Sequence, residues 1–307
     1  MGLVNVVLPV FLIIAAGYGL RLRGFIEDEL NAGLSRLVFY VCAPALLFHS
    51  TAQHAFDPRG SVPALLAIGG ITACVSLGVY AFAGRLPRSR RGVIAQACHR
   101  SNTVFIGLPI VMNAYGDAAL PVVSVVIGFM VVVENLFAVL VLTLPQEGHS
   151  VRDPRLWGRT AVRIALNPLI LACAAGVLYS TLGAPLPVAL DRSLAFMGAP
   201  AAPLGLLCVG AGLEFRRLRH EVRGVAVVSL VRLIVHPALI YLALRRLGVE
   251  GIALGAPVLI MACPTAVVSY IMAREMEGDA PFAAALIIGT TTVSIVTLLA
   301  WLVVLGV

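Results

Sequence analysis

Two polar clusters interrupt long apolar stretches of this chain, and each holds residues that start or break helices. They cover 98–109 and 261–270. Ser and Asn are good helix N-caps, and Pro cannot continue a regular hydrogen-bond ladder. A helix N-terminus carries unpaired amides and partial positive charge, so two such ends facing one cavity would bind an anion. The candidate substrate-binding residues are Ser101, Asn102, Thr103, Thr265, Ser269 and Tyr270, and the candidate hinge residues are Ser101, Pro109, Pro264 and Ser269.

This pattern predicts two discontinuous helices that unwind near the middle of a membrane. Their second halves would begin near Ser101–Asn102 and near Ser269. Such a site would need no dedicated cationic side chain. The alternative is that Pro and Ser kink ordinary helices, while their polar groups bond to the preceding turn. The spacing alone leaves both interpretations open.

Glu134 and Asn135 lie midway along another apolar stretch and are further candidates for substrate contact. Glu134 is the only acid deep in a predicted span, which makes it a candidate proton carrier or ion-pair partner. A buried pair with Arg232 is the structural alternative. An ionised Glu134 beside an anion site would repel the substrate, so it should be protonated, paired or turned away.

Residue patterns typical of enzymes are missing from the sequence. It has no Walker-type P-loop, no nucleophile elbow and no H-E-x-x-H motif. The six Cys fall inside apolar stretches, without a C-x-x-C pair or a Cys/His cluster of metal-binding spacing. We therefore expect no enzymatic activity, no metal and no cofactor.

The composition indicates a membrane protein. The 307 residues are 60% hydrophobic and 12% charged, with a mean hydropathy of +0.99. A soluble protein needs polar helix faces on its outside, and most helices here lack them, so the apolar residues must face lipid. The net charge of +7 reflects arginines in short connectors, which is typical of orientation signals and not of a nucleic-acid surface.

A bilayer core requires about 20 apolar residues per helix. On that basis we predict an all-α membrane protein with ten transmembrane helices and no separate soluble domain. The predicted spans are 3–20, 30–49, 62–83, 93–114, 118–144, 161–182, 194–213, 222–244, 251–271 and 280–305.

The arginines indicate how the chain is oriented. Most lie in connectors that share one side of the membrane, whereas the connectors of the other side carry only Arg59, Arg192, Arg245 and Arg246. Because positively charged connectors stay in the cytoplasm, this pattern predicts a multi-pass protein of the cell (inner) membrane with both termini outside.

The longest inner connector, a cytoplasmic loop at about 145–160, separates two sets of five helices, about 1–144 and 161–307. An odd number of helices per set makes the two repeats inverted, which is a common plan of secondary transporters. The segments Tyr115–Ala118 and Glu277–Ala280, which follow the fourth and ninth helices, are similar to each other. Their support is weak, since Gly-Asp is ordinary turn chemistry.

Several segments, in order, resemble the auxin efflux carrier family over nearly the whole chain. They are Gly17–Arg21, Leu34–Tyr40 and Pro44–His49 in the first two helices, Asn102-Thr103-x-x-x-Gly107-Leu108-Pro109 in the fourth, Arg232 with Pro237 in the eighth, and Pro264–Glu275 in the ninth. Their order and spacing together are specific. This chain departs from the plant carriers at Ser101 and Ser269, where they have Pro, and it lacks their long central loop. These differences concern auxin specificity and leave carrier function intact.

The resemblance implies a crossover fold of the NhaA and bile-acid-symporter type, in which the fourth and ninth helices are broken and cross, and it implies a homodimer. It further implies that Asn102 contacts the substrate carboxylate and that Glu134 or Asn135 approaches from the fifth helix. We expect a secondary carrier or uniporter for a small organic anion, such as a carboxylate or an auxin-like acid, that works by alternating access. The alternatives are a sodium-coupled organic-anion symporter and a membrane sensor or scaffold without flux.

Overall fold

The computed structural model describes residues 4–53, 58–144, 158, 162, 165–183, 185–213 and 221–307. Every regular element in these residues is a helix, and the β-bridge between Ser101 and Thr265 is isolated. The all-α prediction is therefore confirmed for this part of the chain. The predicted connector at 145–160 lies, apart from residue 158, outside the described residues.

The helices before the connector include one that is continuous through a π-turn, Asp28–Gln53, and one that is interrupted at residues 100–102. The elements are α1 (Val4–Leu22), α2 (Asp28–Leu37), the π-turn η1 (Val38–Cys42), α3 (Ala43–Gln53), α4 (Pro58–Phe82), η2 (Ala83–Arg85), α5 (Arg88–His99), the π-turn η3 (Thr103–Gly107), α6 (Leu108–Tyr115), η4 (Asp117–Ala119) and α7 (Leu120–Thr143).

The helices after the connector follow a similar plan. They are α9 (Pro168–Ser180), α10 (Val188–Gly198), α11 (Ala201–Ala211), α12 (Val222–Leu230), the π-turn η6 (Val231–Val235), α13 (His236–Arg246), α14 (Gly251–Met261), α15 (Val268–Glu275) and α16 (Ala280–Leu305).

Six continuous helical stretches in the described residues are long and apolar enough to cross a membrane. They are Asp28–Gln53, Ser61–Arg85, Asp117–Thr143, Val188–Ala211, Val222–Arg246 and Ala280–Leu305, and they coincide with six of the predicted spans. At the other four predicted positions the apolar helices are shorter, namely Val6–Leu22, Thr103–Tyr115, Pro168–Ser180 and Gly251–Met261. The helices predicted at 93–114 and 251–271 are short because each is interrupted.

The helix predicted at 161–182 is shorter for a local reason. The Asn167 side chain caps α9 by accepting the backbone N–H of Leu169 at 3.0 Å. Pro168 then takes the first helical position, where its missing N–H and fixed φ are favourable. These two residues define where α9 begins.

Large apolar side chains cover much of the outside of the molecule. Phe196 is 78% exposed and Leu178 is 70% exposed, and both lie on helices of predicted spans. Polar side chains such as Arg232, His236 and Glu134 are buried instead. This distribution is stable in lipid and costly in water, so the chain is a multi-pass membrane protein.

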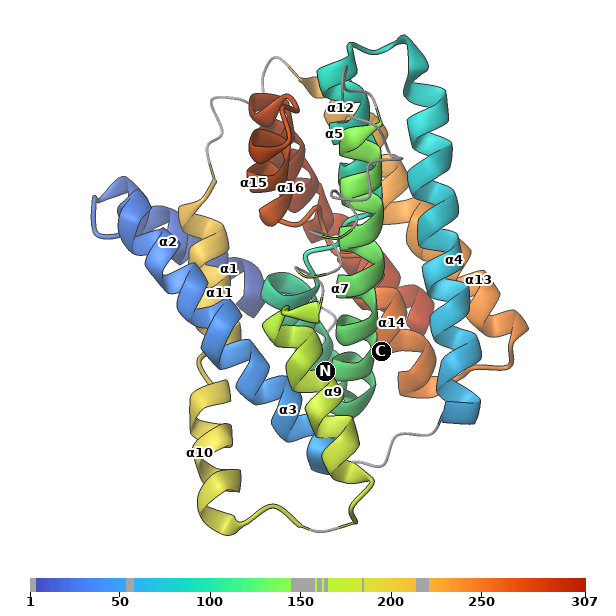
Figure 1. Cartoon of the computed structure of the whole chain (residues 1–307). Coiled ribbons are helices and arrows are strands. Elements are labelled where there is room, and N and C mark those ends of the chain that lie inside the picture. Colours follow the sequence, from blue (N-terminus) through green and yellow to red (C-terminus); the bar gives the residue numbers. More distant parts are fainter. Residues whose placement is uncertain are drawn as a thin grey trace.

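The helices gather into two bundles that pack against each other, with α1, α2 and α11 at the left of Figure 1 and α4 and α13 at its right. The smaller bundle contains α1, α2, α3, α9, α10 and α11, and within it α1 packs along α11 and α3 along α9. The larger bundle contains α4 to α7 and α12 to α16, and it includes both interrupted helices.

Glycines allow the helices of the smaller bundle to approach closely. A Cβ atom at Gly17 of α1 would lie 2.3 Å from the carbonyl oxygen of Leu207 in α11. A Cβ atom at Gly210 of α11 would lie 1.9 Å from the carbonyl oxygen of Ile14. Small residues at such contacts are the usual means of tight helix packing in membranes, so α1 and α11 form a rigid pair.

An ionic cluster joins the ends of three helices of the larger bundle. Arg90 at the start of α5 donates to both carboxylate oxygens of Glu221 (2.7 and 3.0 Å) and to Asp279 (2.7 Å). Its guanidinium also stacks 4.7 Å from the centroid of the Phe282 ring. The hydrogen bonds to Glu221 raise the pKa of Arg90, so its guanidinium stays charged. It holds α5, α12 and α16 together near their N-termini.

Two glycine substitutions in α1 test the packing of the smaller bundle. We expect Gly17→Ala to lower the free energy of unfolding by about 1–3 kcal/mol, because the new Cβ meets the backbone of α11. Gly19→Ala, two residues away, should leave stability unchanged or slightly raised, since no atom lies within 4 Å of its Cβ position. Thermal unfolding in detergent measures both, and equal melting temperatures for the two variants would contradict the packing.

Candidate functional site

The two interrupted helices meet where each is unwound, and we call this meeting point the crossover. It consists of residues 100–102, between α5 and η3, and residues 262–267, between α14 and α15. The segments run antiparallel, with the Asn102 N–H donating to the Pro264 carbonyl at 2.8 Å and the Ala266 N–H donating to the Arg100 carbonyl at 3.1 Å. Each segment satisfies backbone groups of the other, as backbone away from water requires. The predicted discontinuity of both helices is confirmed.

The second half-helices begin close to the predicted positions. η3 starts at Thr103 and α15 at Val268, with Asn102 and Val267 as the N-cap residues. Neither N-cap side chain bonds to its helix. The Asn102 carbonyl instead accepts the Gly107 N–H at 2.9 Å, which closes the π-turn. Side-chain capping, which the Ser and Asn residues predicted, is therefore not seen at either half-helix, and the Asn102 side-chain amide does not bond to its own helix.

The two predicted hinge prolines lie in different settings. Pro264 is inside the crossover, where its carbonyl pairs with the opposite segment. Pro109 lies in the first turn of α6, beyond the π-turn, where a proline is well tolerated. The break is thus upstream of Pro109, and a hinge role for this residue stays a prediction.

Glu134 of α7 reaches the crossover. Its side chain is 3% exposed, and its Oε1 accepts the backbone N–H of Ser101 at 2.9 Å. The Ser101 hydroxyl turns the other way and donates to the carbonyl of Ile260. Glu134 therefore supplies an acceptor for an amide that the break in the fourth helix leaves unpaired.

Arg232 of η6 donates hydrogen bonds to the carbonyl ends of the two first half-helices, α5 and α14. Its Nε donates to the Cys263 carbonyl at 3.0 Å and its Nη1 to the His99 carbonyl at 3.4 Å. These carbonyls follow α14 and end α5, where helices carry partial negative charge, so the guanidinium neutralises both. Within the described residues no direct ion pair joins Arg232 to Glu134, and that predicted alternative is not formed.

Arg100 brings a second cation to the crossover. It is 7% exposed, and its Nη2 donates to the Asn135 side-chain oxygen at 3.0 Å. Its Nη1 donates to the Met272 sulfur, a weak acceptor, also at 3.0 Å. Two guanidinium groups, of Arg100 and Arg232, thus lie at the crossover, whereas the sequence suggested that a site there would need no dedicated cationic side chain.

Three buried donor groups at the crossover have no partner in the described residues. They are the Nδ2 amide of Asn102, the hydroxyl of Ser269 and the Nη2 of Arg232. Asn102 and Ser269 are each 2% exposed, and Arg232 is fully buried. Buried donors without acceptors are rare, because each loses its hydrogen bonds to water. Two guanidinium groups and one carboxylate leave the crossover with an excess of positive charge, which suits an anion.

The remaining predicted residues surround this arrangement. Thr265 donates from its hydroxyl to the Ala97 carbonyl at 2.9 Å, so its side chain holds the two segments together. Thr103 is buried in the first turn of η3, while Tyr270 is only partly buried on α15. Asn135 approaches through Arg100, as described above.

Two residues at the crossover were missed by sequence reasoning as parts of the site. Arg100 directly precedes Ser101, and its place inside the polar cluster was the available signal. His236 accepts a hydrogen bond from Arg232 and faces the Thr72 hydroxyl at 3.1 Å, which fixes the position of the guanidinium. Its signal was the i, i+4 spacing from Arg232 on one helix.

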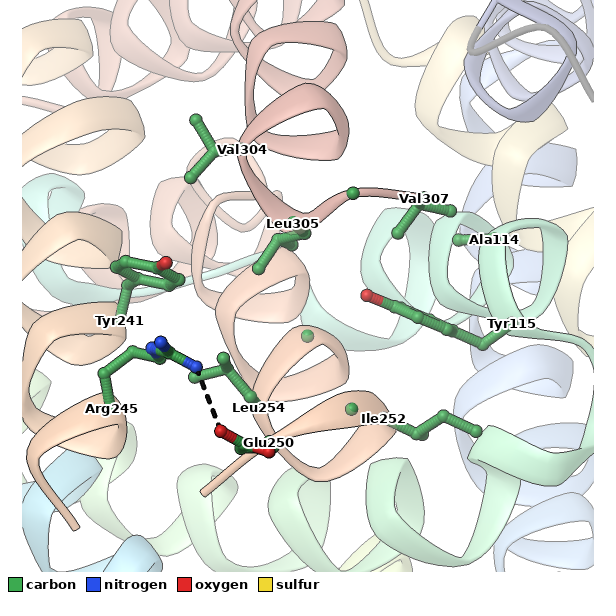
Figure 2. A pocket seen from close by; sticks show the side chains of 13 residues that line it. Ala114, Tyr115, Tyr241, Arg245, Glu250, Ile252, Leu254, Val304, Leu305 and Val307 are labelled. Atoms are coloured by element: carbon green, nitrogen blue, oxygen red, sulfur yellow. Dashed lines mark hydrogen bonds and ion pairs between the residues drawn. The ribbon is translucent and has the colours of Figure 1, made fainter. Parts of the chain in front are cut away.

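A separate cavity of about 720 Å³ lies at the far ends of α6, α13, α14 and α16, all helices of the larger bundle. Figure 2 shows Tyr115 and Tyr241 lying on either side of it, with the ion pair of Arg245 and Glu250 at its edge. None of the predicted substrate-binding residues lines this cavity. The cavity is therefore separate from the unpartnered donors at the crossover.

Known proteins give an independent comparison. The family model described as "Membrane transport protein" matches residues 3–302. The chain is 26% identical over 311 residues to an uncharacterized transporter of Methanothermobacter thermautotrophicus, covering 99% of both proteins. It is 27% identical over 303 residues to a protein of Rhizobium meliloti named "Putative malonate transporter", covering 95% of this chain and 92% of the relative. Since the family model spans nearly the whole chain, the protein belongs to the membrane transport protein family, which is that of the auxin efflux carriers.

Proposed function

We propose that this protein is a secondary carrier or uniporter that moves a small organic anion, such as a carboxylate, by alternating access. The observation that carries the proposal is the set of three buried donors without partners, on Asn102, Ser269 and Arg232. They come from three separate segments that meet at the crossover, beside the second cation Arg100. A carboxylate can accept several hydrogen bonds at once, so its oxygens match this set of donors.

The strength of binding follows from the same groups. A helix N-terminus stabilises an anion by about 0.3–2 kcal/mol, and the half-helix that starts at Thr103 offers its first-turn amides. In α15 the Ser269 and Tyr270 amides already donate to the carbonyls of Ala266 and Val267. The second helix end therefore contributes less than the first. Binding of this kind is weak, as a carrier that must release its cargo requires.

Alternating access would arise from motion of one bundle against the other. The crossover belongs to the larger bundle, and small residues lie where the bundles touch. A Cβ at Gly205 of α11 would come within 2.8 Å of the Phe105 ring, and a Cβ at Gly128 of α7 within 3.0 Å of Cys173. Small residues let packed helices lie close together, and small sliding movements of packed helices are one way in which bundles shift against each other. The substrate would bind between the bundles at Asn102.

The proposed architecture is a pair of inverted five-helix repeats, 1–144 and 161–307, with broken helices four and nine. An inverted repeat relates the first helix to the sixth and the second to the seventh, so a contact between the first and seventh helices should be matched by one between the sixth and second. Such a matched pair supports the proposal, since α1 of the first span packs along α11 of the seventh, and α9 of the sixth span packs along α3 of the second. We further propose a homodimer in the cell membrane with both termini outside. The excess of arginine in the inner connectors supports this orientation, although several of these arginines lie outside the described residues.

Substrate class and coupling are also part of the proposal. The relative of Rhizobium meliloti named for malonate supports an organic anion. A sodium-coupled symporter would instead need an oxygen-rich cation site beside the anion site. Flux of carboxylate into vesicles that requires sodium would favour the symporter, and binding without any flux would favour a sensor or scaffold.

The first test removes the Asn102 amide. Purified protein in detergent is heated with mono- and dicarboxylates, including malonate and indole acetate. We expect at least one carboxylate to raise the melting temperature of the wild type by mass action and to leave Asn102→Ala unshifted. Asn113→Ala is the matched control, because Asn113 lies on α6 and donates to the Val6 carbonyl away from the crossover. A carboxylate that shifts both variants equally would place the anion elsewhere.

A second test uses the free hydroxyl of Ser269. Because this hydroxyl has no protein partner, Ser269→Ala should keep the melting temperature of the empty protein. Loss of one hydrogen bond of about 1 kcal/mol should weaken carboxylate binding roughly fivefold. Ser101→Ala is the contrasting variant, since it loses the bond to Ile260 and should lower stability. Unchanged affinity in Ser269→Ala would remove Ser269 from the site.

A further inference from the structure

The Glu134 carboxylate accepts a hydrogen bond from one of the donors of the proposed anion site. The Ser101 N–H that it accepts is adjacent in sequence to Asn102, whose side-chain amide has no partner. Backbone amides at an interrupted helix are the groups that bind anionic substrates in discontinuous-helix carriers. In the structure, one such amide is already bound to a carboxylate of the protein itself. The inference below rests on the proposed function and concerns how the same site is controlled.

A substrate carboxylate at Asn102 and an ionised Glu134 would oppose each other. Both would lie in a buried region, where like charges repel strongly, and both would accept a hydrogen bond from the same Ser101 amide. The two arginines are engaged elsewhere, Arg100 with Asn135 and Met272, and Arg232 with the carbonyls of His99 and Cys263. Neither forms an ion pair with Glu134 in the described residues. The Glu134 carboxylate therefore keeps the Ser101 amide for itself, and a substrate carboxylate must compete with it for that donor.

We propose that Glu134 is a resident substitute for the substrate carboxylate, and that it takes up a proton and releases the Ser101 amide when the substrate binds. One O–H bond forms, on a Glu134 oxygen, with a proton from water. The substrate stays ionised, and the Ser101 N–H passes from Glu134 to the substrate. Binding of a monocarboxylate then adds no net charge to the buried site, so anion and proton bind together.

The other titratable groups near Glu134 are poorer proton acceptors. His99 bonds through Nδ1 to the Ala95 carbonyl and faces the Glu134 carbonyl through Nε2. His236 accepts from Arg232 at Nδ1. Each ring lies beside a permanent guanidinium charge, which disfavours a second positive charge. Cys98 and Cys263 are buried free thiols, and a neutral thiol already carries its proton. The group that takes up the proton is therefore Glu134.

The sign of the pH effect follows from the proton balance. Because a proton is bound together with the anion, raising the pH opposes binding, and the dissociation constant rises by up to about tenfold per pH unit. Without a carboxylate at 134, this dependence should vanish. We expect Glu134→Gln to bind the anion with no pH dependence and, at alkaline pH, about tenfold more tightly than the wild type.

The experiment measures binding and proton uptake in the full chain. Malonate and indole acetate are titrated into purified protein by calorimetry at and above neutral pH, where both probes are ionised. Buffers of different ionisation enthalpy report the number of protons taken up. The variants are Glu134→Gln and, as a matched control, Glu250→Gln, whose carboxylate is 77% exposed at the distant cavity. Wild type and the control should take up a proton on binding, and Glu134→Gln should not.

The outcomes separate this inference from the proposed function. Carboxylate binding to the wild type without proton uptake would overturn the role of Glu134 and leave the carrier proposal standing. Proton uptake that persists in Glu134→Gln would assign the proton to another group and would also overturn it. Failure of both probes to bind the wild type would overturn both proposals. Because proton uptake is measured on the wild type, the inference is tested even if Glu134→Gln does not fold.

Discussion

The structure depends on how the backbone N–H and carbonyl groups of two interrupted helices find hydrogen-bond partners away from water. Two helices are interrupted at one place, which leaves carbonyls at the ends of α5 and near the end of α14, and amides at the starts of η3 and α15. An antiparallel pairing of the two segments uses some of these groups, Arg232 takes carbonyls, and Glu134 takes an amide. A charged residue at membrane depth is expensive. Here the charged side chains of Arg232 and Glu134 each supply hydrogen bonds that the helix breaks removed.

The same requirement explains the division into two bundles. The crossover needs side chains from α7 and η6 around it, so these elements pack with α5 and α14 into the larger bundle. The smaller bundle contains close helix pairs held by glycine and contributes few polar groups to the crossover. The larger bundle thus holds the crossover with its buried charges, and its contact with the smaller bundle includes the small residues Gly128 and Gly205. Hydrogen bonds from Asn113 to the Val6 carbonyl and from the Cys173 thiol to the Ser124 carbonyl also cross this contact.

The proposed binding and its proposed control would use neighbouring donors at the crossover. The crossover leaves Asn102, Ser269 and Arg232 each with a donor that has no partner, while the Ser101 amide is held by Glu134. A site built from helix ends and side-chain amides is weak by nature, which is compatible with release. Arg232 has a structural task at the same time, since it bonds the carbonyls of both segments. Removing it would disturb folding and binding together, which is why Asn102 and Ser269 are better probes of the site.

The sequence by itself determined that this is a membrane protein and where its apolar helices lie, because apolar length and arginine placement are local properties. For the helices at 93–114 and 251–271 it left open whether they are interrupted or only kinked, and the structure decided that both are interrupted. The sequence also pointed to Asn102, Ser101, Ser269 and Glu134 as polar residues at membrane depth. Only the tertiary structure decided which groups meet. Arg100 turned toward Asn135, Arg232 bonded carbonyls instead of Glu134, and Asn102 left its own helix uncapped. Those choices arise from the pairing of segments more than 150 residues apart, and no local pattern encodes a partner at that distance.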